Sequence, residues 1–313
     1  MSLDAMEEEI ADQIEDLPRF VSQLEKQRFP HVAPSELVFT GSGDSYAAAL
    51  FAQELSDGVA LASDPYELSL KPHRARGKHV VLISVSGRTK ANIQLAQRLK
   101  RVARKKVAIT ANPSSPLARV CDEKIVLQYS TAGRLTSGTV SFTTSLLACA
   151  GILRESPRGI RLRAGMAKAA RWAKGLRVPV GGAFYFVGSG VNRALAEYGA
   201  CKIHEVLGAK AYAQFPEQLG HSQLFSIDPK HDMVICIPNG TNDKTWSVSR
   251  ALSLHGFHVH SVTGQARNSV ARSLEVSFHL QHLALSFARR RGMKECAFLA
   301  DKSRLHLSNR LIY

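Results

Sequence analysis

The chain has 313 residues, of which 45% are hydrophobic and 21% are charged. This is the composition of a soluble globular protein long enough for two ordinary domains, and it excludes a disordered, collagen-like or membrane-embedded chain. The 41 basic and 26 acidic residues give a net charge of +15, so we consider an anionic partner: a nucleic acid, a lipid surface or a phosphorylated small molecule.

Residues 1–30 predict an acidic helical arm, because seven acidic side chains occur before residue 17. The arm lacks the basic and then apolar layout of a signal peptide. The apolar run Val80–Ile83, extended to Val85 across Ser84, is far shorter than the roughly 20 residues of a membrane span. We therefore expect a cytoplasmic protein that makes no contact with a membrane.

Residues 31–153 predict a first α/β domain. Short apolar strands end at Thr40, Ile83 and Thr110, and a helical stretch follows the first two. Continuously apolar strands that alternate with helices are typical of a parallel sheet covered on both faces.

Residues 154–178 predict a basic linker helix, in which eight Lys and Arg residues face one acid, Glu155. Residues 1–150 carry 18 basic and 16 acidic residues, a net +2, whereas residues 151–313 carry 23 and 10, a net +13. The helix either contacts a nucleic acid or lipid, or it is a solvated face or one that pairs with the acidic arm. We favour the solvated or paired face and expect no nucleic-acid partner, because no aromatic-rich RNA-binding signature or DNA-binding motif accompanies the charges.

Residues 179–290 repeat the pattern of the first domain. The segment from Glu36 to Gly43 returns from Ala183 to Gly190, and the segment from His79 to Gly87 returns from Asp232 to Gly240. The chain therefore predicts two copies of one domain, followed by a tail, residues 291–313.

Ligands of a parallel sheet bind at the carboxyl ends of the strands, where helix amino ends offer free N–H groups. Two loops of the first copy lie there, Gly41–Ser45 and Ser84–Thr89. The second loop could give several hydroxyl and amide donors to one phosphate, although a Ser/Thr cluster is also a common helix cap. Neither loop has a nucleotide fingerprint. The corresponding loop of the second copy, Pro238–Asn242, is poorer in hydroxyls, so we expect a single phosphate site in the first copy.

The five cysteines are scattered and never spaced C-x-x-C, which argues against a disulfide framework and a zinc site. We expect neither a metal nor a cofactor.

Several motifs, in this order and spacing, resemble sugar-isomerase (SIS) domain proteins. They are the acidic start Met6–Ile10, both strand-end loops, Ser141–Leu146, Lys202-Ile203-His204-Glu205, Ala209–Tyr212 and Glu217–His221. The similarity is greatest to the isomerase half of glucosamine-6-phosphate synthase and to stand-alone phosphosugar isomerases and deaminases. The resemblance implies two tandem flavodoxin-like SIS domains, a small sugar phosphate as ligand, and a homodimer with a shared active site.

The resemblance also implies roles for single residues. Ser84, Ser86 and Thr89 would hold the phosphate, with Ser42, Gly43, Ser45 and Ser137 near the sugar. Glu205 would move a proton between C1 and C2, Lys202 would contact the sugar oxygens, and the tail would contribute to the site. His221, sixteen residues after Glu205, would open the ring and would come from the neighbouring subunit. These residue types suit aldose–ketose chemistry, which needs a carboxylate to shuttle one proton and a group near neutral pKa to open the ring.

The tail departs from the synthase, whose Schiff-base lysine falls on Ser308 or Asn309 here. Three functions stay open: an aldose–ketose isomerase of a hexose 6-phosphate or similar sugar phosphate acting through an enediol, a deaminase or deglycase of an amino-sugar phosphate, and a phosphosugar-sensing regulator that performs no catalysis. We favour the isomerase.

Overall fold

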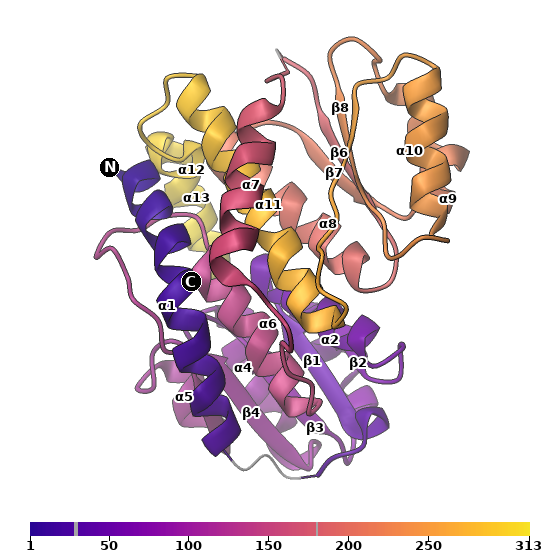
Figure 1. Cartoon of the computed structure of the whole chain (residues 1–313). Coiled ribbons are helices and arrows are strands. Elements are labelled where there is room, and N and C mark those ends of the chain that lie inside the picture. The colour runs from indigo at the N-terminus through magenta and orange to yellow at the C-terminus, as the bar shows by residue number, and fades with distance from the viewer. Residues whose placement is uncertain (28–30, 180) are drawn as a thin grey trace. The chain divides into compact units, whose positions relative to one another are not determined.

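The computed structural model describes residues 1–27, 31–179 and 181–313, and it divides into two units that are each assembled from several segments (Figure 1). The last three residues of the expected arm, 28–30, lie outside the described residues. The five-stranded unit consists of Asp12–Ser130, Val140–Ser156 and Ser303–Tyr313. The four-stranded unit consists of Met1–Ala11, Thr131–Thr139 and Pro157–Lys302.

The sheet of the five-stranded unit is parallel throughout, and its strands run in the order β2-β1-β3-β4-β5. This is the flavodoxin-like order 2-1-3-4-5. Every residue of β1 and β3 is buried, as expected for apolar, β-branched segments covered on both faces. The strands are β1 (Leu37–Gly41), β2 (Leu61–Ser63), β3 (His79–Ile83), β4 (Lys105–Thr110) and β5 (Glu123–Val126).

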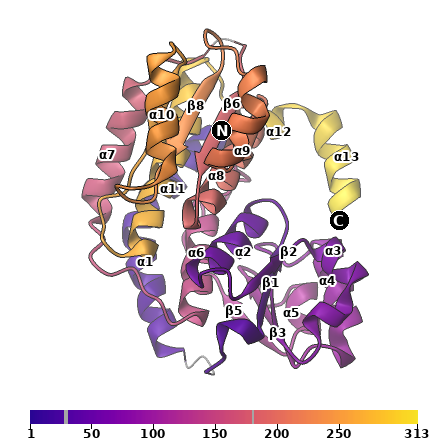
Figure 2. The same cartoon turned by 90° about the vertical axis from the view of Figure 1, so that its right-hand side faces the viewer.

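Helices cover both faces of this sheet. On one face Leu68, Leu95 and Leu117, from three successive helices, pack against Val80 and Leu82 of β3; Figure 2 shows these helices, α3, α4 and α5, on one side of the strands. The other face meets α2, which packs against α6. The helices are α2 (Asp44–Leu55), α3 (Pro65–Leu70), α4 (Lys90–Arg98), α5 (Pro116–Val120) and α6 (Val140–Ile152), with α13 (Lys302–Ile312) at the end of the chain.

The sheet of the four-stranded unit has the order β7-β6-β8-β9 and is also parallel. Its order equals that of the first four strands of the other sheet, 2-1-3-4. Strands β6 and β8 are the segments that the repeat pairs with β1 and β3. The strands are β6 (Phe184–Gly188), β7 (Ala211–Gln214), β8 (Met233–Ile237) and β9 (Val259–Ser261).

Helices again cover both faces. Leu219 of α9 and Leu252 of α10 belong to the apolar cluster on one face, whereas Phe287 of α11 meets Phe184 on the other, with ring centroids 6.0 Å apart. On that second face, Phe186 of β6 packs so closely against Gly199 of α8 that a Cβ there would lie 2.7 Å from its ring. The helices are α7 (Leu162–Gly175), α8 (Val191–Lys202), α9 (Pro216–His221), α10 (Lys244–Leu254), α11 (Ser269–Arg290) and α12 (Ala297–Ala300).

The predicted basic linker helix is α7, which lies beside α11 (Figure 1). It buries Met166, Ala169 and Ala173, while its cations Lys168 and Arg171 are exposed. The apolar stripe therefore docks the helix and the charge faces solvent. This arrangement agrees with the favoured solvated face.

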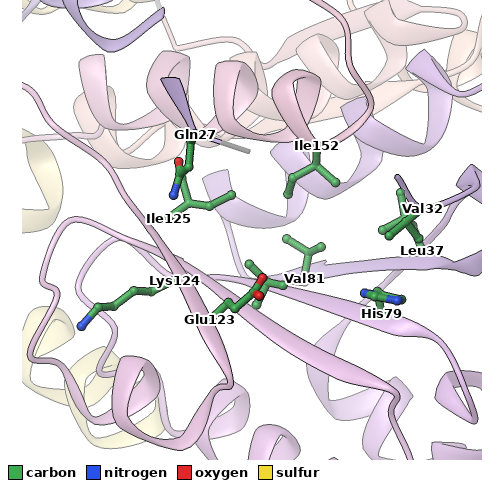
Figure 3. A pocket seen from close by; sticks show the side chains of 10 residues that line it. Gln27, Val32, Leu37, His79, Val81, Glu123, Lys124, Ile125 and Ile152 are labelled. Atoms are coloured by element: carbon green, nitrogen blue, oxygen red, sulfur yellow. The ribbon is translucent and has the colours of Figure 1, made fainter. Parts of the chain in front are cut away.

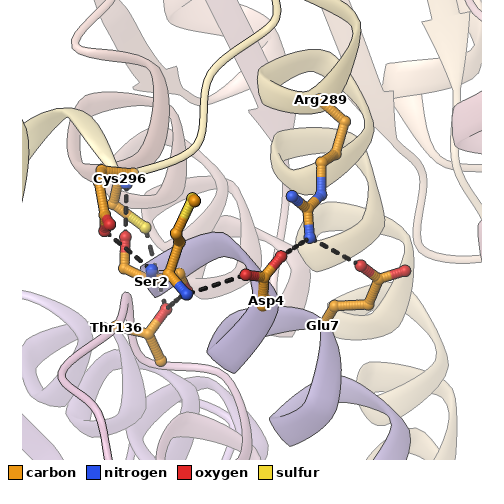
Figure 4. A network of polar contacts seen from close by, with 8 residues as sticks. Ser2, Asp4, Glu7, Thr136, Arg289 and Cys296 are labelled. Carbon is orange, nitrogen blue, oxygen red and sulfur yellow. Dashed lines mark hydrogen bonds and ion pairs between the residues drawn. The ribbon is translucent and has the colours of Figure 1, made fainter.

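The start of the acidic helix α1 (Ser2–Lys26) is anchored within the four-stranded unit (Figure 4). Arg289 of α11 donates to Asp4 at 2.6 Å and to Glu7 at 2.9 Å. The hydroxyl of Thr136 donates to the Ser2 carbonyl, and the Cys296 N–H donates to the Ser2 hydroxyl, each at 2.8 Å. At least these two acids of α1 thus pair with α11 and not with the basic helix.

Among the described residues, none of the helices combines the length and the apolar character that crossing a membrane requires. The predicted domain boundaries, at residues 30, 153, 178 and 290, stay a prediction, because both units are assembled from discontinuous segments.

Candidate active site

The two predicted phosphate loops leave neighbouring strands of the five-stranded sheet. β1 and β3 pair in parallel from Leu37 and His79 to Gly41 and Ile83, so both loops start at the same edge. In the order 2-1-3-4-5, the chain turns in opposite directions after β1 and β3, and ligands of such sheets bind at this topological switch point. The structure therefore brings the predicted loops to the position where a ligand is expected.

The loop after β3 has a hydroxyl pair at the amino end of α4. The Oγ of buried Ser84 lies 3.0 Å from Oγ1 of Thr89, and Thr89 holds the N-cap position of α4 without capping the helix by its side chain. The helix-capping interpretation of this cluster is therefore wrong for Thr89. The N–H groups of the first turn of a helix have no intrahelical acceptor, so they can bind an anion.

Two contacts fix the shape of this loop. Gly87 has φ +62°, and a Cβ there would lie 2.1 Å from the Ser115 hydroxyl, so only glycine fits. The Ser86 hydroxyl accepts the Arg88 N–H at 3.2 Å. The turn packs the loop against the amino end of α5, whose N-cap is Ser115.

The loop after β1 is equally tight. A Cβ on Gly41 would lie 2.6 Å from the Ser45 carbonyl oxygen, and Gly43 has φ +58°. Ser42 and Gly43 are exposed at the tip, whereas Ser45 is buried in the first turn of α2. Ser42 and Gly43 thus offer polar groups to a ligand at the switch point.

Three predicted residues of the four-stranded unit meet at one carboxylate oxygen. Oε2 of Glu205 accepts the Ser137 hydroxyl and the Lys202 ammonium, each at 2.6 Å. Nζ of Lys202 also donates to Oγ of Ser137 at 2.6 Å, which closes the triangle. The Lys202 side chain is fully buried, whereas that of Glu205 is 35% exposed. A buried cation thus holds a carboxylate that solvent can reach.

A local widening of the backbone positions this carboxylate. Helix α8 ends at Lys202, and the chain continues in a π-helical turn, Ile203–Leu207, that closes at Gly208 with φ +63°. Single π-helical turns occur frequently at functional sites. Glu205 lies in this turn and pairs with Lys202, which precedes it by three residues.

Tyr198 supports the cluster and was not among the predicted site residues. Its hydroxyl donates to the Gly138 carbonyl at 2.9 Å, next to Ser137 in the chain. The Nζ of Lys202 lies 5.2 Å from the centre of its ring, within the range of a cation–π contact. Its spacing of one helical turn from Lys202 was a signal that could have revealed it.

His221 has its polar contact elsewhere. It is the last residue of α9, its side chain is 72% exposed, and its Nε2 lies 3.1 Å from Oε1 of Glu217. The structure thus does not join His221 to the hydrogen-bonded cluster of Ser137, Lys202 and Glu205. The predicted phosphate loops belong to the five-stranded unit and this cluster to the four-stranded unit.

At the switch point of the second sheet, a side chain of the protein itself accepts the available hydrogen bonds. Asp243, the N-cap of α10, accepts the Ser189 hydroxyl from the loop after β6 and the Asn239 N–H from the loop after β8, both at 2.6 Å. It also accepts the Thr245 N–H at 2.7 Å. Burial alone would raise the pKa of Asp243, but these hydrogen bonds outweigh burial and hold the pKa below its ordinary value. A carboxylate of the chain therefore takes the donors that a bound anion would use.

An apolar cavity of the five-stranded unit lies at the opposite edge of its sheet (Figure 3). It is lined by Val81, Ile125 and Ile152, near His79, the first residue of β3. Burial first, and then the charges of Arg104 and Lys105, lower the pKa of His79, so its ring stays neutral near pH 7. Because the cavity lies at the opposite edge of the sheet, and because its apolar residues and neutral histidine do not suit a phosphate, we do not assign the phosphate to it.

Comparison with known families identifies the segment that carries both predicted phosphate loops. Residues 33–152 match the SIS domain, which confirms the resemblance for this part of the chain. No curated protein matches the sequence significantly.

Solved structures of similar fold cover nearly the whole chain. Glucosamine-6-phosphate deaminase from Thermotoga maritima has a TM-score of 0.76 at 21% identity, over 92% of this chain and 95% of its own. The C-terminal domain of glucosamine-fructose-6-phosphate aminotransferase from Francisella tularensis has a TM-score of 0.71 at 17% identity, over 93% and 97%. Tagatose-6-phosphate ketose/aldose isomerase from Escherichia coli has a TM-score of 0.64 at 15% identity, over 94% and 91%. At sequence identities of 15–21%, these similarities show only that the fold is shared.

Proposed function

We propose that this protein is an aldose–ketose isomerase that acts on a hexose 6-phosphate or a similar sugar phosphate. The observation that carries the proposal is the contact of Ser137 and Lys202 with one oxygen of Glu205. Lys202 and Ser137 occupy Oε2, so Oε1 of the same carboxylate is the better placed to take a proton. A positioned carboxylate is the group that enediol chemistry needs.

In this mechanism Glu205 removes a proton from C1 of the open-chain ketose, the electrons of the C–H bond form the C1–C2 double bond, and the carbonyl electrons move to O2, which gives an enediolate. The same carboxyl group then returns the proton to C2 while the hydroxyl proton on O1 passes to O2, so that the carbonyl of the aldose forms at C1. Lys202 and Ser137 stay bound to Oε2 and keep the carboxylate in one orientation. Tyr198 holds the segment of Ser137 in place through Gly138.

The phosphate of the substrate binds between the loops after β1 and β3. Ser84, Ser86 and Thr89, with the first-turn N–H groups of α4, are the donors, and Ser42, Gly43 and Ser45 line the sugar. The switch-point location and the hydroxyls that are not used for capping support this assignment. It needs no cofactor.

The four-stranded unit is a second SIS domain that arose by duplication and no longer binds a phosphate. Its strand order and the sequence repeat support the duplication. Asp243 takes the place of the anion at its switch point. Each chain thus has one phosphate site, in the first domain.

The active site is shared between the two subunits of a homodimer. His221 is exposed and oriented by Glu217, which suits a residue that a neighbouring subunit presents to open the sugar ring. The tail, residues 291–313, completes the site.

A deaminase of an amino-sugar phosphate is the second candidate, because the structure of the Thermotoga maritima deaminase resembles this chain over 92% of its length. Assays of the purified protein with fructose 6-phosphate and with glucosamine 6-phosphate distinguish the two. The isomerase forms an aldose 6-phosphate from the first, and the deaminase releases ammonia from the second. Saturable binding of both with turnover of neither would instead indicate a sensor.

A further inference from the structure

Two histidines converge at the edge of the second sheet, away from the residues assigned above. His258 and His260 flank Val259 in β9, the last strand of its sheet, so their side chains project from the same face. Their Nε2 atoms lie 2.9 Å apart, and their ring centroids lie 4.8 Å apart at 76°. Both side chains are half-buried, so solvent can reach them.

We propose that His258 and His260 form a two-nitrogen chelate for a divalent cation of the copper and nickel class. Imidazole nitrogens bind such ions at about 2.0–2.1 Å. Two nitrogens at that distance and at right angles are about 2.9 Å apart, and at the tetrahedral angle about 3.3–3.4 Å apart. The observed spacing fits neighbouring corners of the tetragonal geometry that Cu²⁺ and Ni²⁺ prefer over the tetrahedron typical of Zn²⁺.

The protonation state of the two imidazole rings allows them to bind a metal cation. Without metal, one Nε2 carries the proton that bridges to the other Nε2. With metal, that ring transfers its proton to Nδ1, so both rings stay neutral and no proton is released. Burial lowers the pKa of both rings, and the charge of its neighbour further lowers that of His260 to about 4, so both are unprotonated near pH 7.

The positive charge of Arg177 and the lack of further protein ligands among the described residues limit the affinity of the site for a cation. Arg177 also lowers the pKa of His258 and repels a cation. Among the residues that the structure describes, no group of three or more His, Cys, Asp and Glu side chains could hold a metal ion. Water therefore fills the remaining positions, and the ion exchanges readily.

Titration of the metal-free full-length protein with Cu²⁺ tests the proposal, read by calorimetry and by electron paramagnetic resonance. We expect one ion with two nitrogen ligands, at least tenfold weaker binding in His258→Ala and in His260→Ala, and no change in His255→Ala, an exposed histidine nearby. The Arg177→Ala variant should bind Cu²⁺ more tightly than the wild type does.

Equal Cu²⁺ affinity in the wild type and in both single variants would overturn the proposal, as would the absence of binding. If the single variants do not fold, selective broadening of the His258 and His260 ring signals by Cu²⁺ in the wild type replaces them, and broadening elsewhere overturns the site. None of these readouts depends on isomerase activity.

Discussion

Ser137 and Glu205 are 68 residues apart in the chain, yet the hydroxyl of one donates to the carboxylate of the other at 2.6 Å. The type of each residue was predictable, because the motif Lys202–Glu205 and its order among the other motifs are visible in the sequence. Their contact was not, because it depends on tertiary packing that brings the segment before α6 to the end of α8. Tyr198 lies one helical turn from Lys202, a spacing that is visible in the sequence, but the contact of its hydroxyl with Gly138, 60 residues away, was not predictable.

The side-chain hydroxyls that we assign to the phosphate site can be tested by single substitutions. Thr89→Val keeps the shape of the side chain and removes its hydroxyl, so a phosphate loses one donor. We expect about 10- to 150-fold weaker binding of the sugar phosphate, since a hydrogen bond to a charged group contributes about 1.5–3 kcal/mol. Isothermal titration with fructose 6-phosphate measures this change.

Thr144→Val is the matched control for Thr89→Val, because the Thr144 hydroxyl bonds the Val140 carbonyl within α6. It should leave the affinity unchanged. Equal affinities of the wild type and Thr89→Val would remove Thr89 from the phosphate site.

Among the elements, the alternation of strands and helices was readable because parallel strands covered on both faces are continuously apolar. For the loop after β8, the sequence indicated only that it has few hydroxyl groups. That Asp243 accepts donors from two loops could not be predicted, because Ser189 and Asp243 are 54 residues apart. The π-helical turn after α8 was also not predictable, since no residue type specifies it.

Asp243 makes the stability of the second sheet depend on pH. Its pKa is lower in the folded chain than its ordinary value of about 3.9, so its carboxylate stabilises the fold above that value and the effect is lost as the pH falls through the folded-state pKa. Asp243→Asn should therefore lower the free energy of unfolding by about 1–2 kcal/mol at pH 7. Once the pH falls below the folded-state pKa, the difference should shrink.

Urea denaturation of both proteins at pH 7 and at a pH below the folded-state pKa measures this difference. Asp64→Asn is the control, because Asp64 caps α3 by accepting the Tyr66 and Glu67 N–H groups, and Asn caps a helix about as well as Asp. A difference for Asp243→Asn that stays the same at both pH values would contradict the role given to the carboxylate.

For the whole molecule, the net charge of +15 first suggested a polyanion. The basic helix α7 is a docked helix with a solvated face, and the proposed phosphate site needs only a few directed donors. The sequence repeat predicted two similar halves, and both sheets share the order 2-1-3-4. The SIS match covers residues 33–152, which lie in the first half of the chain.

A shared site has a direct consequence in mixed dimers. Glu205→Gln and His221→Ala should each be inactive alone, because each site then lacks one residue. Random mixing of equal amounts should restore about a quarter of the wild-type activity, since half of the dimers are mixed and each has one intact site. Co-expression followed by an isomerase assay measures this, and no recovery in confirmed mixed dimers would place His221 and Glu205 of one chain in the same site.

The central claim is that Glu205 transfers the proton of a bound sugar phosphate. The most direct test compares the turnover of fructose 6-phosphate by the wild type, by Glu205→Gln and by Glu197→Gln, a control in which the half-buried partner of Arg193 is changed on α8. We predict that Glu205→Gln lowers kcat by about 10²–10⁴-fold, the usual contribution of a general base, while binding persists and Glu197→Gln stays active. Full turnover by Glu205→Gln would contradict the account.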